Sequence, residues 1–131
     1  MNEEEIFREN LIAIPEEIEE SLSQSGGIAG LIRQLPGDDD IEAACIIYRA
    51  LADPVRIKIL HLLMVQPLCV CVIKAVIKMA DSRLSYHLNI LKKAGIIEGE
   101  QQGYYIIYHI AQEARKFMEQ ETERLVSRKL G

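Results

Sequence analysis

Hydrophobic residues recur at helical spacing over most of the chain. Residues 3–35 form a broken apolar stripe in two helical pieces, with Pro15 suited to open the second piece and residues 25–27 (SGG) weakening it. The sequence PGDDD at 36–40 predicts a boundary and then a helix over about 41–51, because acids favour the positive N-terminal end of a helix. The first third of the chain is therefore predicted to be helical.

Three more helices are predicted in the middle of the chain. Asp53 is a good N-cap for a helix whose first position is Pro54. Pro67 can open a short helix over about 67–78, and Asp81 is the expected N-cap of the next one. That last helix ends at Gly95, which stands at the C-terminal cap position. Its inward face is predicted to consist of Leu84, Leu88 and Leu91.

The last third of the chain adds strands. Residues 96–110 (IIEGEQQGYYIIYHI) contain two β-rich segments around a Gln-Gln-Gly turn, and a closing helix follows from residue 111. The predicted fold is mainly α with a small β-hairpin, in the order of a winged helix-turn-helix. Residues 1–37 are predicted to be an acidic helical arm, and residues 38–131 the winged helix-turn-helix domain.

Composition limits the class of protein. The 131 residues fit one domain with an arm, and 49% of them are hydrophobic, which is enough for a core. No apolar run reaches the roughly 18 residues that a membrane span needs, and the acidic start MNEEEIF is unlike a secretory signal. Three cysteines are too few for a disulfide scaffold. We therefore expect a cytoplasmic protein with reduced thiols and no membrane partner.

The charge is unevenly distributed. Residues 1–50 carry twelve acids and three bases, whereas residues 51–110 carry seven bases and four acids. An acidic arm therefore precedes a mildly basic middle, which permits DNA binding despite the net charge of −5.

The predicted helix that follows Asp81 has the residues that a DNA-reading helix needs. Its first turns contain Ser82, Arg83, Ser85, Tyr86 and His87. Arg can bind guanine with two hydrogen bonds, and hydroxyl groups bind bases or phosphates. Further phosphate contacts are expected from Lys92, Lys93, Arg56 and Lys58. The alternative is an ordinary amphipathic helix with a polar face.

Four segments in this order strongly resemble the arsenical-resistance repressor (ArsR/SmtB-type) family of transcription regulators. They are LADPVRIKILHLL, PLCVCVIKAVI, SRLSYHLNILKKAGII and QGYYIIYHI. The resemblance covers about residues 40–120 and implies a homodimeric repressor, dimerised through its terminal helices, that binds double-stranded operator DNA and releases it when an inducer binds. It assigns DNA reading to the predicted helix that follows Asp81 and to the wing tip, with Gln102 and Tyr104.

The wing departs from the family. Family wings commonly carry Arg, whereas this one reads EGEQQGYY, with Glu98 and Glu100 and no base. DNA affinity should therefore rest mainly on the recognition helix. Because each phosphate contact adds about one unit to the log–log salt dependence, we expect a shallow slope.

The segment PLCVCVIKAVI raises the question of a sensor. Cys69 and Cys71 match the Cys-Val-Cys of the family's arsenic- and cadmium-responsive members, but Val72 replaces the motif's Asp and Lys74 stands where some members have a third Cys. Residues i and i+2 of a regular helix point about 200° apart, so binding one ion requires an irregular first turn. Cys45 could complete a site within the subunit or across the dimer.

Three interpretations of the cysteine pair remain open. Cys69 and Cys71, with or without Cys45, bind a soft inducer (arsenite, cadmium or zinc); or they form a redox switch; or they are structural. For the switch, a disulfide between i and i+2 is strained, so Cys45 or the other subunit is the expected partner. The family's other metal site uses His on the C-terminal helix, which has none here.

An enzyme and a protein-binding module are two other classes of function. An enzyme is not expected, because the three His are scattered and the chain has neither a Cys-x-x-Cys motif nor a phosphate-binding loop rich in glycine. No cofactor is required for the regulator. A winged-helix module for protein binding is the nearer rival, because the arm is acidic and the wing lacks bases.

Overall fold

The computed structural model describes residues 13–130, which form two compact units that divide after Ile41. In the first unit, α2 (Glu16–Gln24) follows Pro15, and α3 (Gly27–Gln34) follows a break at Gly26. Gly26 has a φ of 86°, in the left-handed region that favours glycine, so the chain turns there. The second predicted helical piece is therefore interrupted where the SGG sequence indicated. The first piece lies largely outside the described residues.

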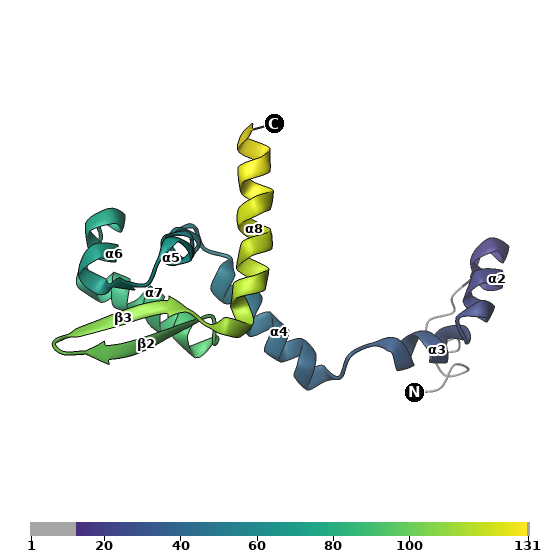
Figure 1. The fold of residues 1–131 in the computed structure, drawn as a ribbon. Helices are drawn as coiled ribbons and strands as arrows, with labels where there is room; N and C mark the ends of the chain where they lie inside the picture. The colour runs from purple at the N-terminus through teal and green to yellow at the C-terminus, as the bar shows by residue number, and fades with distance from the viewer. Residues whose placement is uncertain (1–12, 131) are drawn as a thin grey trace. The chain divides into compact units, whose positions relative to one another are not determined.

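The second unit contains the rest of the described elements. They are α4 (Asp38–Leu51, which begins at the end of the first unit), α5 (Pro54–Val65), β1 (Leu68–Cys69), α6 (Val70–Ile77), α7 (Asp81–Lys93), β2 (Ile97–Gln102), β3 (Tyr105–Ile110) and α8 (Gln112–Leu130). In the view of Figure 1, α5 and α6 lie above a projecting β2–β3 hairpin and α7 runs behind it, while α8 leaves from the base of the hairpin. This arrangement confirms the predicted fold, a mainly helical winged helix-turn-helix.

The sheet has three antiparallel strands in the order β1-β3-β2. The predicted helix over 67–78 is wrong at its start, because Leu68 pairs with Tyr108 and Cys69 with Ile107 on the edge of β3. These pairings draw residues 68 and 69 into extended backbone, and the helix begins only at Val70. The cysteine pair therefore straddles a strand–helix junction.

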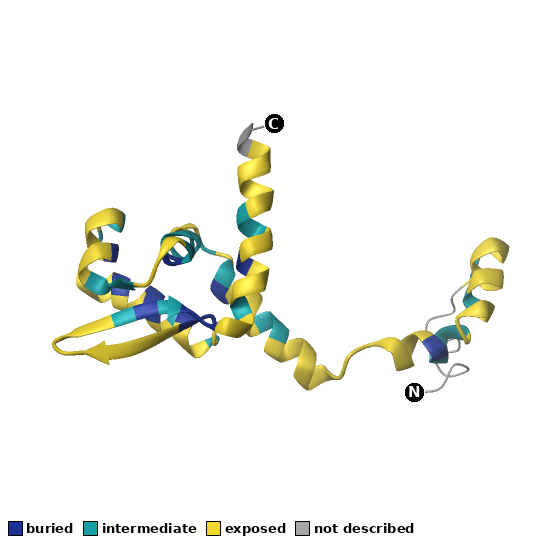
Figure 2. Cartoon of the chain, viewed as in Figure 1, coloured by how far each residue is buried: buried dark blue, intermediate teal, exposed yellow. Residues whose placement is uncertain are grey.

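The core lies between the three central helices and the base of the hairpin. Figure 2 shows buried positions concentrated there and an exposed hairpin tip. The predicted inward residues of α7 are all buried, and they pack with Ile59 and Leu63 of α5 and Ile73 of α6. Burial of this apolar surface stabilises the unit at roughly 25 cal/mol per Å².

Local signals explain most helix ends. Asp53 caps α5 as predicted, since its Oδ1 accepts hydrogen bonds from the backbone N–H groups of Val55 (2.8 Å) and Arg56 (3.1 Å). The predicted cap of α7 is wrong: Asp81 is the first helical residue and forms an ion pair with Lys74 (2.7 Å). Gly95, with a φ of 75°, follows the end of α7 as expected.

Candidate DNA interface and cysteine pair

The exposed face of α7 is polar and lies opposite its buried leucines. Ser82, Arg83, Ser85 and Tyr86 are exposed, as are Lys92 and Lys93 near the helix end. Leu84, Leu88 and Leu91 anchor the other face in the core. A helix held in this way can enter a major groove without losing its packing.

His87 does not belong to that face. Its side chain is 8% exposed, and its Nδ1 lies 3.1 Å from Nη1 of Arg56. The prediction that His87 reads DNA is therefore wrong, because the ring points into the protein. The predicted phosphate contact of Arg56 is wrong for the same reason, since its guanidinium is taken up by internal acceptors.

Asp53 completes this internal group. Its carboxylate lies 3.9 Å from both Arg56 and His87. Burial acts to raise the pKa of Asp53, but the backbone N–H of Arg56, the charge of Arg56, the neighbouring His87 ring and the backbone N–H of Val55 together outweigh it. The pKa of Asp53 is held below its usual value, and the carboxylate stays charged at neutral pH.

Arg83 shares a groove with two lysines, one on α5 and one at the end of α6. Lys58 of α5, Lys78 after α6 and Arg83 of α7 line one groove of about 470 Å³. The sequence predicts a phosphate contact for Lys58 but gives no such signal for Lys78. Lys78 adopts a left-handed conformation (φ 57°) at the turn between α6 and α7, where no sequence pattern marks it as a neighbour of Arg83. A groove with three cations attracts phosphate.

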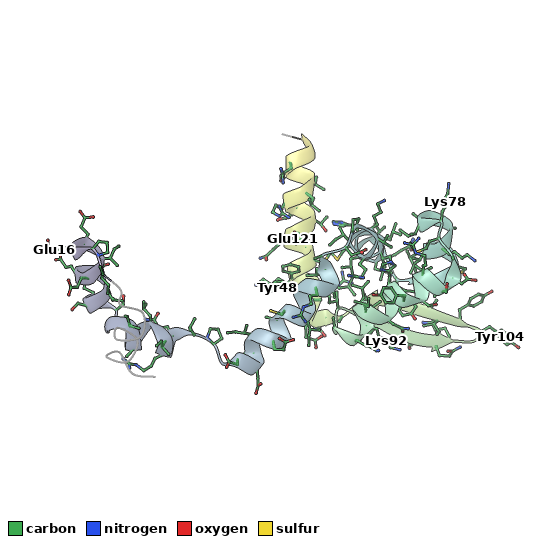
Figure 3. The ribbon with its side chains drawn as sticks, turned by 180° about the vertical axis from the view of Figure 1, so that it is seen from behind. Glu16, Tyr48, Lys78, Lys92, Tyr104 and Glu121 are labelled. Carbon is green, nitrogen blue, oxygen red and sulfur yellow. A yellow bond between two sulfur atoms is a disulfide. The ribbon has the colours of Figure 1, made fainter. Side chains whose placement is uncertain are left out.

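The tip of the wing presents uncharged groups to solvent. Tyr104 is fully exposed at the hairpin tip, where Figure 3 shows its side chain projecting from the body, and Gln102 is exposed beside it. Gln101 donates a hydrogen bond to the carbonyl of Gly103 (2.8 Å) and so braces the turn. Glu98 is occupied by His109 at 3.0 Å. The wing tip can therefore offer hydrogen bonds and an aromatic ring, but no cation.

Cys69 and Cys71 lie together and are joined by a disulfide. Cys69 is the extended N-cap of α6 and Cys71 is already helical, so the junction is irregular and turns both sulfur atoms the same way. The prediction that strain would send either sulfur to Cys45 or to another subunit is wrong. Cys71 is exposed and Cys69 half-buried, so solvent reaches the pair.

Cys45 stays apart from this pair. It is a free, half-buried thiol on α4. Within residues 13–130, no three His, Cys, Asp or Glu side chains gather into a group that could hold a metal ion. The described residues therefore bring no third such side chain to Cys69 and Cys71 within one subunit.

An apolar groove separates α4 from α8. It measures about 290 Å³, and Ile47, Tyr48 and Phe117 are among its lining residues. All three are at least 40% exposed, so a large apolar surface remains uncovered. Figure 3 shows Tyr48 on α4 at the side of α8.

Among the described residues, none of the helices has the length and apolar character needed to cross a bilayer.

The comparisons with known proteins agree with this geometry. Residues 53–98 match the family model described as bacterial regulatory protein, arsR family. The uncharacterized HTH-type transcriptional regulator MJ1325 of Methanocaldococcus jannaschii is 41% identical over 76 residues, which are 57% of this chain and 85% of that protein.

Other relatives match over a smaller share of their length. The HTH-type transcriptional repressor SmtB of Mycobacterium tuberculosis is 37% identical over 58% of this chain. The cadmium resistance transcriptional regulatory protein CadC of Listeria innocua is 38% identical over 48% of it. The matched segments span only 56% and 54% of these two proteins.

A solved structure extends the match beyond the core segment. The crystal structure of M. tuberculosis Rv0081 aligns with a TM-score of 0.60 at 26% identity and covers 71% of this chain and 95% of that one. The winged helix-turn-helix fold, the matched family model and the 41% identity to a regulator covered over most of its length lead to one conclusion: the chain belongs to the arsR family of helix-turn-helix transcriptional regulators.

Proposed function

We propose that the protein is a homodimeric transcriptional repressor that binds double-stranded operator DNA through α7. The observation that carries the proposal is the exposed polar face of α7, fixed over three buried leucines in a winged helix-turn-helix. SmtB, a relative described as a repressor, supports the direction of regulation.

The proposed DNA contacts follow from exposure and chemistry. Arg83 hydrogen-bonds a guanine edge or a phosphate, and the hydroxyl groups of Ser82 and Tyr86 bind bases or phosphates. Lys92 and Lys93 neutralise phosphates beside the end of α7. Gln102 and Tyr104 reach the neighbouring groove without adding charge.

The proposed dimer uses the uncovered apolar surface. Residues Ile47 and Tyr48 of α4 and Phe117 of α8 border the groove between these helices, and a second copy would remove them from water. Burial of apolar side chains is the main favourable term in such associations. A symmetric pair of recognition helices would then match a palindromic operator.

The replacement of Arg83 by Ala tests the DNA contact. The probe is the duplex that the wild-type protein selects from a pool of random sequences. Removing a bidentate arginine should weaken binding by about 1–3 kcal/mol, roughly 5- to 150-fold, without changing the oligomeric state in solution. Arg115→Ala on the exposed face of α8 serves as the control. Equal affinity of Arg83→Ala and wild type would refute the assignment.

We also propose that Cys69 and Cys71 bind a soft ion, arsenite or cadmium, as the inducer. Their Cα atoms are 5.4 Å apart at the strand–helix junction, so the reduced thiolates stay within reach of one ion. The N-terminal end of a helix favours thiolate. The name of CadC, which links that relative to cadmium resistance, supports a soft metal.

The position of the pair explains how an ion could affect DNA binding. Cys69 pairs with Ile107 of the wing strand β3, while Cys71 lies in the first turn of α6, the helix that precedes α7. A bound ion would alter the junction and thereby both the wing and the helix-turn-helix. A third ligand would come from a second subunit or from a small molecule in solution.

An ultraviolet titration of the reduced protein with arsenite, cadmium and zinc tests ion binding. Thiolate-to-metal charge-transfer bands that saturate at one ion per pair are expected, and Cys69→Ser should abolish them. Cys45→Ser separates the contribution of the third thiol: weaker bands in this variant would place Cys45 in a site between subunits. The absence of bands with all three ions would refute the ion site.

A second candidate is a redox switch at the same pair, favoured by the disulfide in the structure. Oxidation by hydrogen peroxide would convert the two thiols to a disulfide, with two electrons and two protons passing to the hydrogen peroxide to give two waters. Mass spectrometry after peroxide treatment should show the loss of two hydrogens from the peptide that contains both cysteines. Dithiothreitol should reverse the change and its effect on DNA affinity.

A further inference from the structure

The guanidinium of Arg56 joins three helices of the second unit. Its Nε donates to the carbonyl of Ala50 (2.6 Å) and its Nη2 to the carbonyl of Arg49 (3.1 Å), both at the end of α4. Its Nη1 lies 3.1 Å from Nδ1 of His87 on α7. Arg56 itself belongs to α5, and its side chain is only 11% exposed. One buried side chain therefore connects the last turn of α4 to the recognition helix.

The donor groups of Arg56 determine which role the Nδ1 atom of His87 has in their contact. A guanidinium has donors only, so His87 must accept at Nδ1 and carry its proton at Nε2. Asp53, 3.9 Å from both partners, balances the charge of Arg56, and its Oδ1 also caps α5. Asp53, Arg56 and His87 form a closed group, which we call the α4–α7 joint.

The α4–α7 joint fixes the rotation of α7, which the packing of leucines alone does not. Leu84, Leu88 and Leu91 hold α7 against the core, but apolar contact is non-directional and allows a helix to slide and rotate slightly. Hydrogen bonds depend on angle as well as distance. His87 directly follows Tyr86 of the exposed face, so fixing the ring of His87 also fixes the direction of that face relative to α4.

We propose that the Arg56–His87 contact sets the half-site spacing that the dimer accepts in its operator. The inference rests on the proposed function, in which α4 belongs to the dimer interface and α7 reads DNA. One extra base pair between half-sites moves them apart by about 3.4 Å and rotates them by about 35°. A recognition helix tied to α4 cannot follow that change, whereas a released helix can adapt.

The test compares two replacements of His87. Leucine has a similar volume and no acceptor, while asparagine retains an oxygen near the position of Nδ1. The probes are the duplex selected by the wild-type protein and the same duplex with one base pair inserted at its centre. Binding is measured below the onset of thermal unfolding of every variant, so that differences in stability do not enter.

The wild-type protein should prefer the original duplex at least about tenfold, because misplacing one half-site forfeits good base contacts. His87→Leu should reduce this preference to about threefold or less, and His87→Asn should restore it, as expected when one directional hydrogen bond is lost and regained. His61→Leu, at a half-buried histidine of α5 that lies outside the joint, should keep the wild-type preference.

Other outcomes would overturn the proposal. If His87→Leu binds both duplexes more weakly by the same factor, the histidine supports the fold and does not set spacing. If that variant fails to fold, Arg56→Lys replaces it, because lysine keeps the charge but cannot bridge two carbonyls and a ring; unchanged discrimination in Arg56→Lys would then refute the role. Selection of no duplex by the wild-type protein would instead refute the proposed function itself.

Discussion

At the scale of single residues, Asp53 combines two roles that can be separated by substitution. Its side chain caps α5, and its charge faces Arg56. Asp53→Ala should lower the free energy of unfolding by about 1 kcal/mol through the lost cap. Asp53→Asn keeps a capping oxygen and removes only the charge. Chemical denaturation at neutral pH should therefore rank wild type above Asn and Asn above Ala.

The lowered pKa of Asp53 gives this ranking a pH dependence. A group whose pKa is lower in the folded state stabilises the fold above its unfolded pKa, and this contribution is lost as pH falls through the folded pKa. The difference in unfolding free energy between wild type and Asp53→Asn should thus be largest near neutral pH and shrink below about pH 4. A difference that is constant between pH 7 and 3 would contradict the role of the charge.

The burial of His87 was predictable from the sequence, but its contact with Arg56 was not. Residues 84, 87, 88 and 91 share one helical face, so the spacing already placed His87 with the buried leucines. It was instead predicted to read DNA because it follows the polar residues Ser85 and Tyr86. The acceptor role of its ring depends on Arg56, 31 positions away, and no local pattern predicts such a partner.

At the scale of elements, the wing depends on close packing between its strands. Gly99 pairs with Tyr108, and a Cβ at position 99 would lie 2.9 Å from the Tyr108 ring and 3.1 Å from Ile106. Gly99→Ala should therefore destabilise the protein by about 1–3 kcal/mol through overpacking. Glu100→Ala, at the next and exposed position, is the matched control. Equal thermal midpoints for the two variants would show that the ring moves aside at no cost.

The elements themselves were largely predictable from the sequence. Caps, apolar spacing and turn residues specified α5, α7 and the hairpin, because these signals are local. The strand at Leu68 and Cys69 was missed, since two residues carry no periodicity and are extended only through pairing with β3, nearly forty positions later. The short distance between the sulfur atoms of Cys69 and Cys71 follows from that pairing, so the sequence did not predict it either.

At the scale of the whole molecule, the charge distribution predicts how DNA affinity depends on salt. A dimer that uses Arg83, Lys92 and Lys93 in each subunit would make six cationic contacts, for a log–log slope of about −5. The wing adds nothing, because it lacks a base. Gln102→Lys should steepen the slope by about two units and strengthen binding at low salt, with one new contact per subunit.

Gln120→Lys on the exposed face of α8 separates this contact from a general effect of charge. This control should leave the slope nearly unchanged. Equal slopes for Gln102→Lys and wild type would mean that the wing tip does not approach the phosphates.

Fluorescence anisotropy of the selected duplex measures whether the repressor is released through Cys69 and Cys71. The reduced wild-type protein and Cys69→Ser are titrated with cadmium or arsenite while bound to the labelled DNA. The proposed function predicts that both proteins bind equally without the ion and that only the wild type is released, at about one ion per cysteine pair. Continued binding by the wild type in a saturating excess of both ions would contradict an inducer site at Cys69 and Cys71.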